Sequence, residues 1–270
     1  MPRFAANLGY LFTDRPLLDR IDAAAAAGFA AIELQFPYDV PASAVKAAIA
    51  RNGLTMLGLN TPPGDREGEF GLAAVPGREK DWDVSFARAL DYASAIGARA
   101  IHCLAGKVAA EQRPSADRVF LQNLVRGADL AAEKNIMLLI EPINGRDRPN
   151  YFLNHVEHAA DLIAKAGQPN IRMQFDFYHV QIVGGDITYR LRKFLPVIGH
   201  LQCAAVPSRH EPDEGELNYP ALFETVDSLG YDGWVGAEYR PRAGTEEGLG
   251  WAMKYGVVPR DRWKMSRQTS

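Results

Sequence analysis

Four stretches in the second half of the chain each place one oxygen-bearing side chain at the end of an apolar run. The four side chains are Glu141, Asp176, Gln202 and Glu238, which follow runs such as Leu138-Leu139-Ile140 and Val235-Gly236-Ala237. Successive members lie roughly 26 to 36 residues apart, which is near the length of one βα unit. On successive strands of a parallel barrel, three carboxylates and one amide would converge on one point and would suit a hard divalent cation.

A structural ion-pair network is the competing interpretation of these carboxylates. A buried unpaired charge is costly, and Glu141 taken singly could pair with a cation such as Arg146. Three anions in one barrel mouth would need three cations, whereas one divalent ion can replace them all. Because the set contains no thiolate or imidazole, it favours Mg²⁺ or Mn²⁺ over zinc. Gln202 is the weakest member, since a strand-end amide can also simply bond to backbone.

Composition is ordinary for a globular protein and excludes several classes. The chain has 270 residues, 47% of them hydrophobic and 23% charged, and a formal net charge of -3. This charge gives no electrostatic case for binding nucleic acid. The N-terminus lacks a signal-peptide pattern, and no apolar run is long enough to span a membrane. Cys103 and Cys203 lie in apolar runs and are expected to be buried free thiols. We therefore expect a cytoplasmic enzyme.

Short apolar runs alternate along the chain with amphipathic helical stretches. Eight strands are predicted, at Phe4–Gly9, Ala31–Phe36, Thr55–Asn60, Ala100–Leu104, Met137–Glu141, Ile171–Phe177, Gly199–Cys203 and Trp234–Tyr239. Helices are predicted at Pro16–Ala27, Ala42–Arg51, Trp82–Ile96, Ser115–Lys134 (with Ser115 as N-cap), His155–Ala166 and Tyr219–Leu229.

Strict alternation of strands and helices predicts an α/β fold, a single (β/α)8 TIM barrel. Gly28, Gly97 and Gly230 each stand between a helix and a strand, as in the turns of a βα repeat. No GxGxxG or GxxxxGK[ST] motif supports nucleotide binding. We assign residues 1–258 to the barrel and 259–270 to a basic tail, and expect the long loops Thr61–Lys80 and Val206–Leu217 to cover the catalytic face.

Further polar side chains near the predicted strand ends could contact a substrate. His179 follows Asp176 closely and could turn back to hydrogen-bond a substrate oxygen without binding metal, or be an ordinary loop histidine. Arg209, next to His210 in a long loop, is the best candidate for binding a carboxylate. Lys107 and Arg240 are further candidates, although each alone is more often a solvated surface charge.

Several phrases together resemble the hydroxypyruvate isomerase family, within the wider group of sugar isomerases, keto-sugar 3-epimerases and endonuclease IV-like TIM barrels. The resemblance covers nearly the whole chain. It rests on Phe4-Ala5-Ala6-Asn7-Leu8, Gly28-Phe29-Ala30-Ala31-Ile32-Glu33, Leu139-Ile140-Glu141-Pro142-Ile143-Asn144, Phe175-Asp176-Phe177-Tyr178-His179, His200-Leu201-Gln202 and Gly236-Ala237-Glu238-Tyr239.

The resemblance implies both a metal site and a reaction. It implies a divalent metal on Glu141, Asp176, Gln202 and Glu238, and an acid/base pair formed by Glu141 and Glu238. The implied reaction interconverts hydroxypyruvate and 2-hydroxy-3-oxopropanoate by proton transfer through an enediolate. Many sugar 3-epimerases have histidine where this chain has Gln202, so the glutamine favours the hydroxypyruvate isomerase branch.

Other functions stay open at this point. A four-carbon 2-oxo-tetronate is a serious rival substrate, and a keto-sugar 3-epimerase comes next. A DNA-repair endonuclease fits less well, because that branch needs several zinc-binding histidines at other strand ends. The chain has six histidines in all, and two of them lie on a predicted helix. A sugar-acid binding module without turnover is a further class. The expected partner is a small molecule, with neither nucleic acid nor membrane, and a homo-oligomer is possible.

Overall fold

The computed structural model describes residues 1–261, and their contacts divide the chain into two compact units. One unit joins Met1–Leu57 to the chain from Leu201 onward, and the other is Gly58–His200. The basic tail expected at 259–270 falls mostly on residues 262–270, outside the described residues. Within residues 1–261, no helix has both the length and the apolar character needed to cross a membrane.

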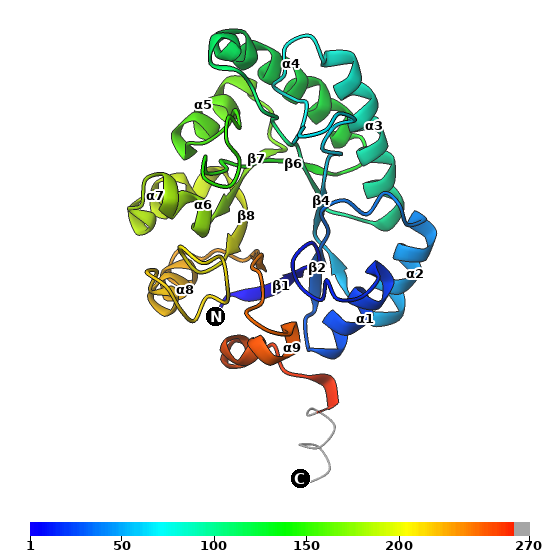
Figure 1. Cartoon of the computed structure of the whole chain (residues 1–270), viewed down its shortest axis with the longest axis vertical. Coiled ribbons are helices and arrows are strands. Elements are labelled where there is room, and N and C mark those ends of the chain that lie inside the picture. Colours follow the sequence, from blue (N-terminus) through cyan, green and yellow to red (C-terminus); the bar gives the residue numbers. More distant parts are fainter. Residues whose placement is uncertain (262–270) are drawn as a thin grey trace. The chain divides into compact units, whose positions relative to one another are not determined.

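The Gly58–His200 unit is built on parallel strands that neighbour one another in chain order, β7-β6-β5-β4. Its elements are β4 (Gly58–Asn60), α3 (Glu79–Ile96), β5 (Ala100–His102), η1 (Ala110–Gln112), α4 (Arg113–Ala132), β6 (Met137–Ile140), α5 (Val156–Ala166), β7 (Ile171–Asp176), α6 (Phe177–Val183), α7 (Ile187–Phe194), η2 (Leu195–Val197) and the start of β8 (Ile198–Cys203). Helices α4 and α5 pack on β6 and β7 respectively (Figure 1).

Apolar periodicity explains why these segments form a covered parallel sheet. In α5 the buried residues are Val156, Ala159, Leu162 and Ile163, which share one face of the helix. Strand β7 is buried along almost its whole length, as is typical of parallel strands that are covered on both faces. Side chains at the carboxyl ends of β6 and β7 are thereby held on a rigid support.

The other unit has the strand order β3-β2-β1-β9-β8, again parallel where the strands pair. Its elements are β1 (Arg3–Asn7), α1 (Leu17–Ala26), β2 (Ala31–Glu33), α2 (Ala42–Asn52), β3 (Thr55–Met56), the end of β8, α8 (Tyr219–Ser228), β9 (Trp234–Ala237), α9 (Thr245–Gly248) and η3 (Leu249–Tyr255). The first strand of the chain pairs with the last, β1 with β9. That pairing is the one that closure of a barrel requires.

The predicted turn glycines have the expected backbone. Gly28, Gly97 and Gly230 all have positive φ angles, of 102°, 73° and 72°. Gly28 also has a steric reason to be glycine, because a Cβ there would clash with the backbone oxygen of Val258. These turns set the direction of the strands that follow them.

All eight predicted strands are present, with differences at their ends. The strand predicted at Thr55–Asn60 is interrupted at Leu57 and forms β3 and β4. The strand predicted to reach Phe177 ends at Asp176, because the Asp176 side chain accepts the Tyr178 N–H and starts helix α6. The predicted Ser115 N-cap is wrong, since α4 already begins at Arg113 and the Ser115 hydroxyl donates to the Gln112 carbonyl. Helices α6 and α7 were not predicted.

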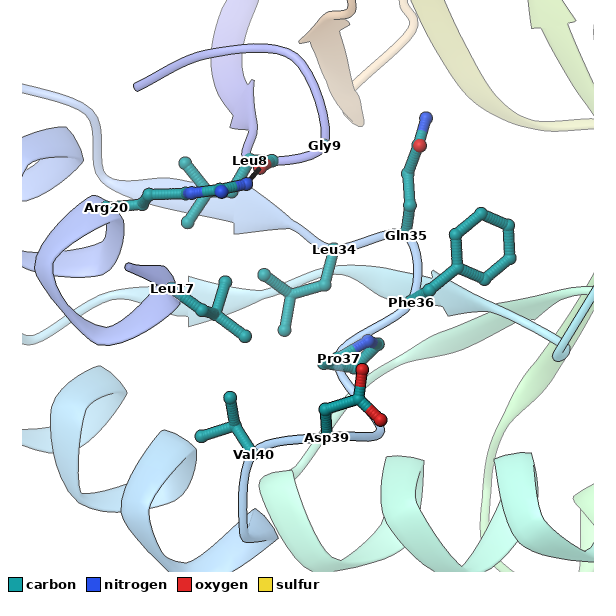
Figure 2. Close-up of a pocket in the computed structure, with 10 residues that line it drawn as sticks. All are labelled: Leu8, Gly9, Leu17, Arg20, Leu34, Gln35, Phe36, Pro37, Asp39 and Val40. Atoms are coloured by element: carbon teal, nitrogen blue, oxygen red, sulfur yellow. Dashed lines mark hydrogen bonds between the residues drawn. The ribbon is translucent and has the colours of Figure 1, made fainter. Parts of the chain in front are cut away.

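A hollow lies beside the carboxyl ends of β1 and β2 (Figure 2). It is lined by Leu8, Gly9, Leu17, Arg20, Leu34, Gln35, Phe36, Pro37, Asp39 and Val40. The Arg20 guanidinium donates to the backbone oxygens of Leu8, at 2.9 Å, and Arg15, at 2.7 Å. Arg20 therefore ties down the loop after β1, and none of the candidate site residues lines this hollow.

Candidate active site

Glu141 follows β6 directly and is buried among polar groups. Its Oε2 accepts a hydrogen bond from Gln174 Nε2 at 3.1 Å and lies 3.4 Å from His102 Nδ1. Burial, with a smaller contribution from the charge of the neighbouring His200, lowers the pKa of His102 to about 3. His102 is therefore neutral near pH 7, so these two partners orient the Glu141 carboxylate without neutralising it.

Asp176 ends β7 and has a different task for each of its oxygens. Oδ1 accepts the Tyr178 N–H at 2.9 Å and caps helix α6. Oδ2 faces His179, whose Nε2 lies 3.6 Å away, and the same Nε2 lies 3.8 Å from Glu141 Oε1. One ligand atom from each of Glu141, Asp176 and His179 lies within 4.8 Å of the others, and all three residues are buried. This group has the spacing to hold a metal ion.

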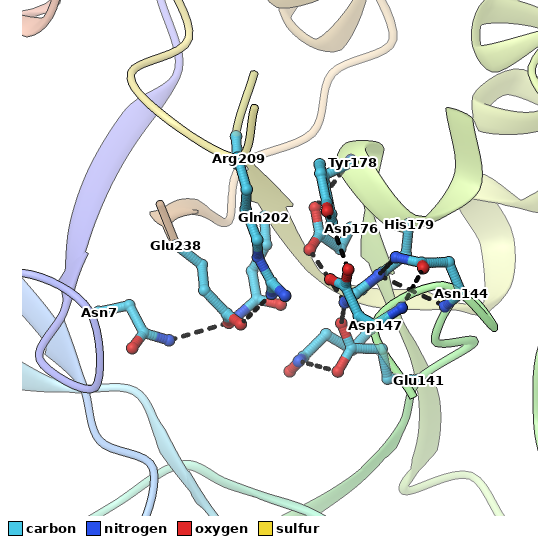
Figure 3. A network of polar contacts seen from close by, with 12 residues as sticks. Asn7, Glu141, Asn144, Asp147, Asp176, Tyr178, His179, Gln202, Arg209 and Glu238 are labelled. Carbon is cyan, nitrogen blue, oxygen red and sulfur yellow. Dashed lines mark hydrogen bonds and ion pairs between the residues drawn. The ribbon is translucent and has the colours of Figure 1, made fainter. Parts of the chain in front are cut away.

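Glu238 follows β9 and accepts hydrogen bonds on both carboxylate oxygens (Figure 3). Oε2 accepts from Asn7 Nδ2 at 3.0 Å and from Gln202 Nε2 at 2.6 Å, while Oε1 accepts from Arg209 Nη2 at 2.9 Å. Asn7 also ends β1, because its Oδ1 accepts the Gly9 N–H at 2.9 Å. Three donors from three different residues thus fix the Glu238 carboxylate in position.

Gln202 provides a test of whether the residues fit a metal ion. Its amide nitrogen donates to Glu33 Oε2 at 2.8 Å and to Glu238 Oε2 at 2.6 Å. Two carboxylate acceptors fix the amide orientation, since only the NH₂ group can donate to them. Within residues 1–261 the buried carbonyl oxygen Oε1 has no hydrogen-bond partner, and such an oxygen suits a cation. Together with the buried Glu238 carboxylate beside it, this oxygen fits a hard divalent ion.

Several cationic side chains were predicted to bind the substrate. Within residues 1–261, Arg209 is the only one of them that is buried and contacts another predicted site residue. Its side chain reaches Glu238, and its guanidinium lies 4.8 Å from the centre of the Tyr10 ring. Its φ of 58° is unusual for a residue other than glycine. Hydrogen bonds from Arg209 N to Ala205 O and from Arg240 N to Arg209 O hold this backbone.

A second contact fastens the loop that carries Arg209. The Glu211 carboxylate is fully buried and accepts from both the backbone N–H and the Nε of Arg242. Arg242 also pairs with Asp213 and Glu214 at 3.0 and 2.8 Å. The loop after β8 is therefore tied to the loop after β9, which keeps Arg209 beside Glu238.

The other predicted substrate residues lie in different surroundings. His210 is half-buried and its Nδ1 bonds to the backbone oxygen of Arg240 at 2.7 Å. Arg240 is exposed and lines a separate hollow with Tyr10, Thr13 and Arg15. Lys107 is also exposed, and so is Arg146, the cation considered as a partner for Glu141. Arg209 is therefore a better candidate than these residues for binding a substrate.

Four partners of the predicted site residues were not singled out as functional from spacing. Asn7 and Glu33 are the last residues of their strands, and the four predicted ligands lie within one residue of their strand ends, so the same rule could have found them. Gln174 shares a strand face with Asp176, two residues away. Asn144 hydrogen-bonds His179, and nothing in the spacing pointed to that contact. These residues hold the candidate ligands rather than replace them.

Gly236 gives a test of the packing between Glu33 and Gln202. A Cβ there would overlap Glu33 Oε1, and would lie 2.8 Å from Glu33 Cδ and 3.0 Å from Gln202 Cγ. We expect Gly236→Ala to lower the free energy of unfolding by about 1–3 kcal/mol, the usual cost of overpacking, in urea unfolding followed by circular dichroism. Gly250→Ala is the control, because nothing lies within 4 Å of its added Cβ. Equal stability of the two variants would contradict this packing.

Comparison with known proteins identifies the class. The family described as xylose isomerase-like TIM barrel matches residues 21–255, and the chain belongs to that family. It is an isomerase of the (β/α)8 fold class, as the sequence predicted.

Individual relatives cover nearly the whole chain. A 2-oxo-tetronate isomerase of Cupriavidus necator is 51% identical over 94% of this chain and 99% of its own length. The hydroxypyruvate isomerase of Escherichia coli is 40% identical over 94% of this chain and 100% of its own length. Among solved structures, one titled AP endonuclease, family 2, from Brucella melitensis has a TM-score of 0.93 and 44% identity, covering 95% of this chain and 100% of that chain.

Proposed function

We propose that the protein is a divalent-metal-dependent isomerase that moves a carbonyl group between neighbouring carbons of a short 2-oxo acid. The observation that carries this proposal is the set of buried oxygen-bearing side chains at strand ends. Among them, the Gln202 amide nitrogen donates to two carboxylates, which leaves Gln202 Oε1 available to bind a cation. The names of the relatives support the same reaction class. A two-oxygen substrate such as an α-hydroxycarbonyl suits a hard cation.

Glu141, Asp176, Gln202 and Glu238 would hold Mg²⁺ or Mn²⁺. All four offer oxygen, the donor that these ions prefer. When bound, such an ion supplies Lewis-acid stabilisation of negative charge on substrate oxygens. The chain itself supports this assignment at two points: Asp176 is oriented by its capping bond, and Gln202 by two carboxylates.

Glu141 and Glu238 would move the proton. One carboxylate removes a proton from the carbon beside the carbonyl, and the other, protonated beforehand from solvent, gives its proton to the former carbonyl carbon. The substrate hydroxyl loses its proton to the former carbonyl oxygen, and the two glutamates return to their starting states by exchange with solvent. Both carboxylates are buried, at 4% and 6% exposure, which removes competing water. Three donors orient the Glu238 carboxylate, and an amide and an imidazole orient that of Glu141.

Arg209 would bind the substrate carboxylate. A guanidinium presents several N–H donors in a planar fork, and the Glu238 contact places this fork beside a proposed catalytic group. The acid would then be held next to the carboxylate that transfers the proton. This preference for an acid separates the proposal from a neutral keto-sugar 3-epimerase.

Arg209→Met should lower kcat/KM for a 2-oxo acid by about a hundredfold or more, because the buried charge pair between the guanidinium and the substrate carboxylate is lost. The loss should be much smaller for a neutral ketose, so the preference for acids should disappear. Steady-state kinetics on both substrate types checks this. Arg240→Met, at an exposed position in the same chain region, should change kcat/KM less than threefold, roughly the effect of a solvated charge. An equal loss for acid and ketose would remove Arg209 from carboxylate binding.

We propose a four-carbon 2-oxo-tetronate as the first substrate to test, because the Cupriavidus relative shares 51% of its residues with the chain. Hydroxypyruvate is the second candidate, supported by the Escherichia coli relative at 40% identity. Both acids need the same transfer of hydrogen between C3 and C2. Proton NMR of product formation, with Mg²⁺ or Mn²⁺ and a panel of 2-oxo acids and ketoses, separates them. Turnover of neutral ketoses alone would support the epimerase alternative.

An endonuclease activity has weaker support. The net charge of -3 provides no general electrostatic attraction for a phosphate backbone. The four proposed metal ligands are all oxygen donors, whereas that activity would call for a set of zinc-binding histidines. A salt-dependent binding assay with duplex DNA would test this class. We expect no binding at physiological ionic strength.

A further inference from the structure

We propose that Asn144 fixes His179 in the tautomer that carries its proton on Nε2, and thereby keeps this histidine out of the metal's ligand set. Asn144 lies in the loop after β6, and His179 lies in the first turn of α6. Figure 3 shows the two side chains in contact. Asn144 would be a positioning residue that acts through His179.

The orientation of the Asn144 amide is set by its own loop. Its Oδ1 accepts the backbone N–H groups of Arg146, at 3.0 Å, and Asp147, at 2.9 Å. Backbone N–H groups can only donate, so the oxygen must face them and the NH₂ group must point the other way. That NH₂ group lies 2.6 Å from His179 Nδ1.

His179 Nδ1 therefore faces donors. Besides the Asn144 side chain, the Asn144 backbone N–H points to the same nitrogen at 3.4 Å. A neutral imidazole has one accepting and one donating nitrogen. With Nδ1 accepting, Nε2 carries the proton, and this N–H faces the carboxylates of Glu141 and Asp176 at 3.8 and 3.6 Å. The negative potential of those carboxylates favours a proton there.

The consequence concerns the choice of metal, and this part depends on the proposed function. By distance, His179 could join Glu141 and Asp176 in binding an ion. A protonated Nε2 has no lone pair to offer, so the ligands remain oxygen atoms and the site favours Mg²⁺ or Mn²⁺ over zinc. The same N–H can donate to a substrate oxygen, the role expected for His179 from its position.

The tautomer can be measured directly in the metal-free protein by ¹⁵N NMR of the histidine rings, with His179 assigned by its loss in His179→Asn. We expect Nδ1 to show the shift of an unprotonated nitrogen and Nε2 that of a protonated one. Asn144→Asp should reverse the two, because a carboxylate accepts from Nδ1–H. Asn150→Asp adds the same charge to an exposed position in the same loop and should leave the ring unchanged.

A second readout follows the metal. Calorimetric titration should show the affinity for Zn²⁺ relative to Mg²⁺ rising at least tenfold in Asn144→Asp and staying unchanged in Asn150→Asp. An unprotonated Nε2 or a doubly protonated ring in the native protein would overturn the proposal, as would an unchanged tautomer in Asn144→Asp. Because the NMR measurement needs no substrate or metal, a protein with the expected tautomer but no isomerase activity would count against the proposed function alone.

Discussion

Glu238→Gln should reduce turnover of the 2-oxo acid by about a thousandfold or more, within the range typical of removing a general base. The change keeps the shape of the side chain and removes its basic lone pair. It also alters the local bonding, because Asn7, Gln202 and Arg209 all donate to this carboxylate. An amide has only one accepting oxygen, so some of these donors lose their acceptor.

The companion variant Glu141→Gln should show a loss of similar size, since the reaction needs one group to remove the proton and another to return it. Single-turnover and steady-state kinetics check both variants. Glu224→Gln, at an exposed position on α8, is the matched control and should retain the native rate. If either active-site variant kept more than a tenth of the native rate, that glutamate could not be a catalytic base.

Asp176→Asn should weaken Mn²⁺ binding by about a hundredfold or more while leaving the fold intact. Loss of one anionic ligand from a hard-ion site removes much of its attraction for the cation. The helix should survive, because asparagine caps helices about as well as aspartate and the Tyr178 N–H keeps an acceptor. The change therefore separates metal binding from folding.

Calorimetric titration with Mn²⁺ measures the affinity, and urea unfolding of the metal-free protein measures stability. Asp186→Asn is the control, since Asp186 precedes α7 as Asp176 precedes α6, but it is exposed. Native Mn²⁺ affinity in Asp176→Asn would remove Asp176 from the ligand set.

Much of the fold could be predicted because its signals are local. Short apolar runs marked all eight strands, and glycines such as Gly97 marked the turns where positive φ is needed. Helices α6 and α7 were missed for different reasons. Helix α6 starts only because the Asp176 side chain caps it directly after a strand. Helix α7 has buried residues at Ile187, Leu191 and Phe194, a helical spacing that could have been found.

The site likewise has features that the sequence predicts and features that it does not. The positions of the four strand-end side chains could be predicted, because a polar residue directly after an apolar run is visible in the sequence. Their mutual contacts could not be predicted, because they join residues far apart along the chain, such as Asn7 with Glu238 and Gln202 with Glu33. The contact between Arg209 and Glu238 depends on an unusual backbone conformation and on the Glu211–Arg242 pair. No local pattern specifies either.

Deuterium incorporation during turnover is the most direct test of proton transfer by the two glutamates. The enzyme, loaded with Mg²⁺, would convert the preferred 2-oxo acid in D₂O, and NMR would follow the hydrogen that arrives at C2. Carboxylates exchange their protons with solvent, so the account predicts deuterium at C2 of the product. Product that retains the hydrogen from C3 and carries no deuterium would mean that the same hydrogen moves between the carbons, either on a single shielded base or as a hydride. It would contradict proton transfer by two glutamates.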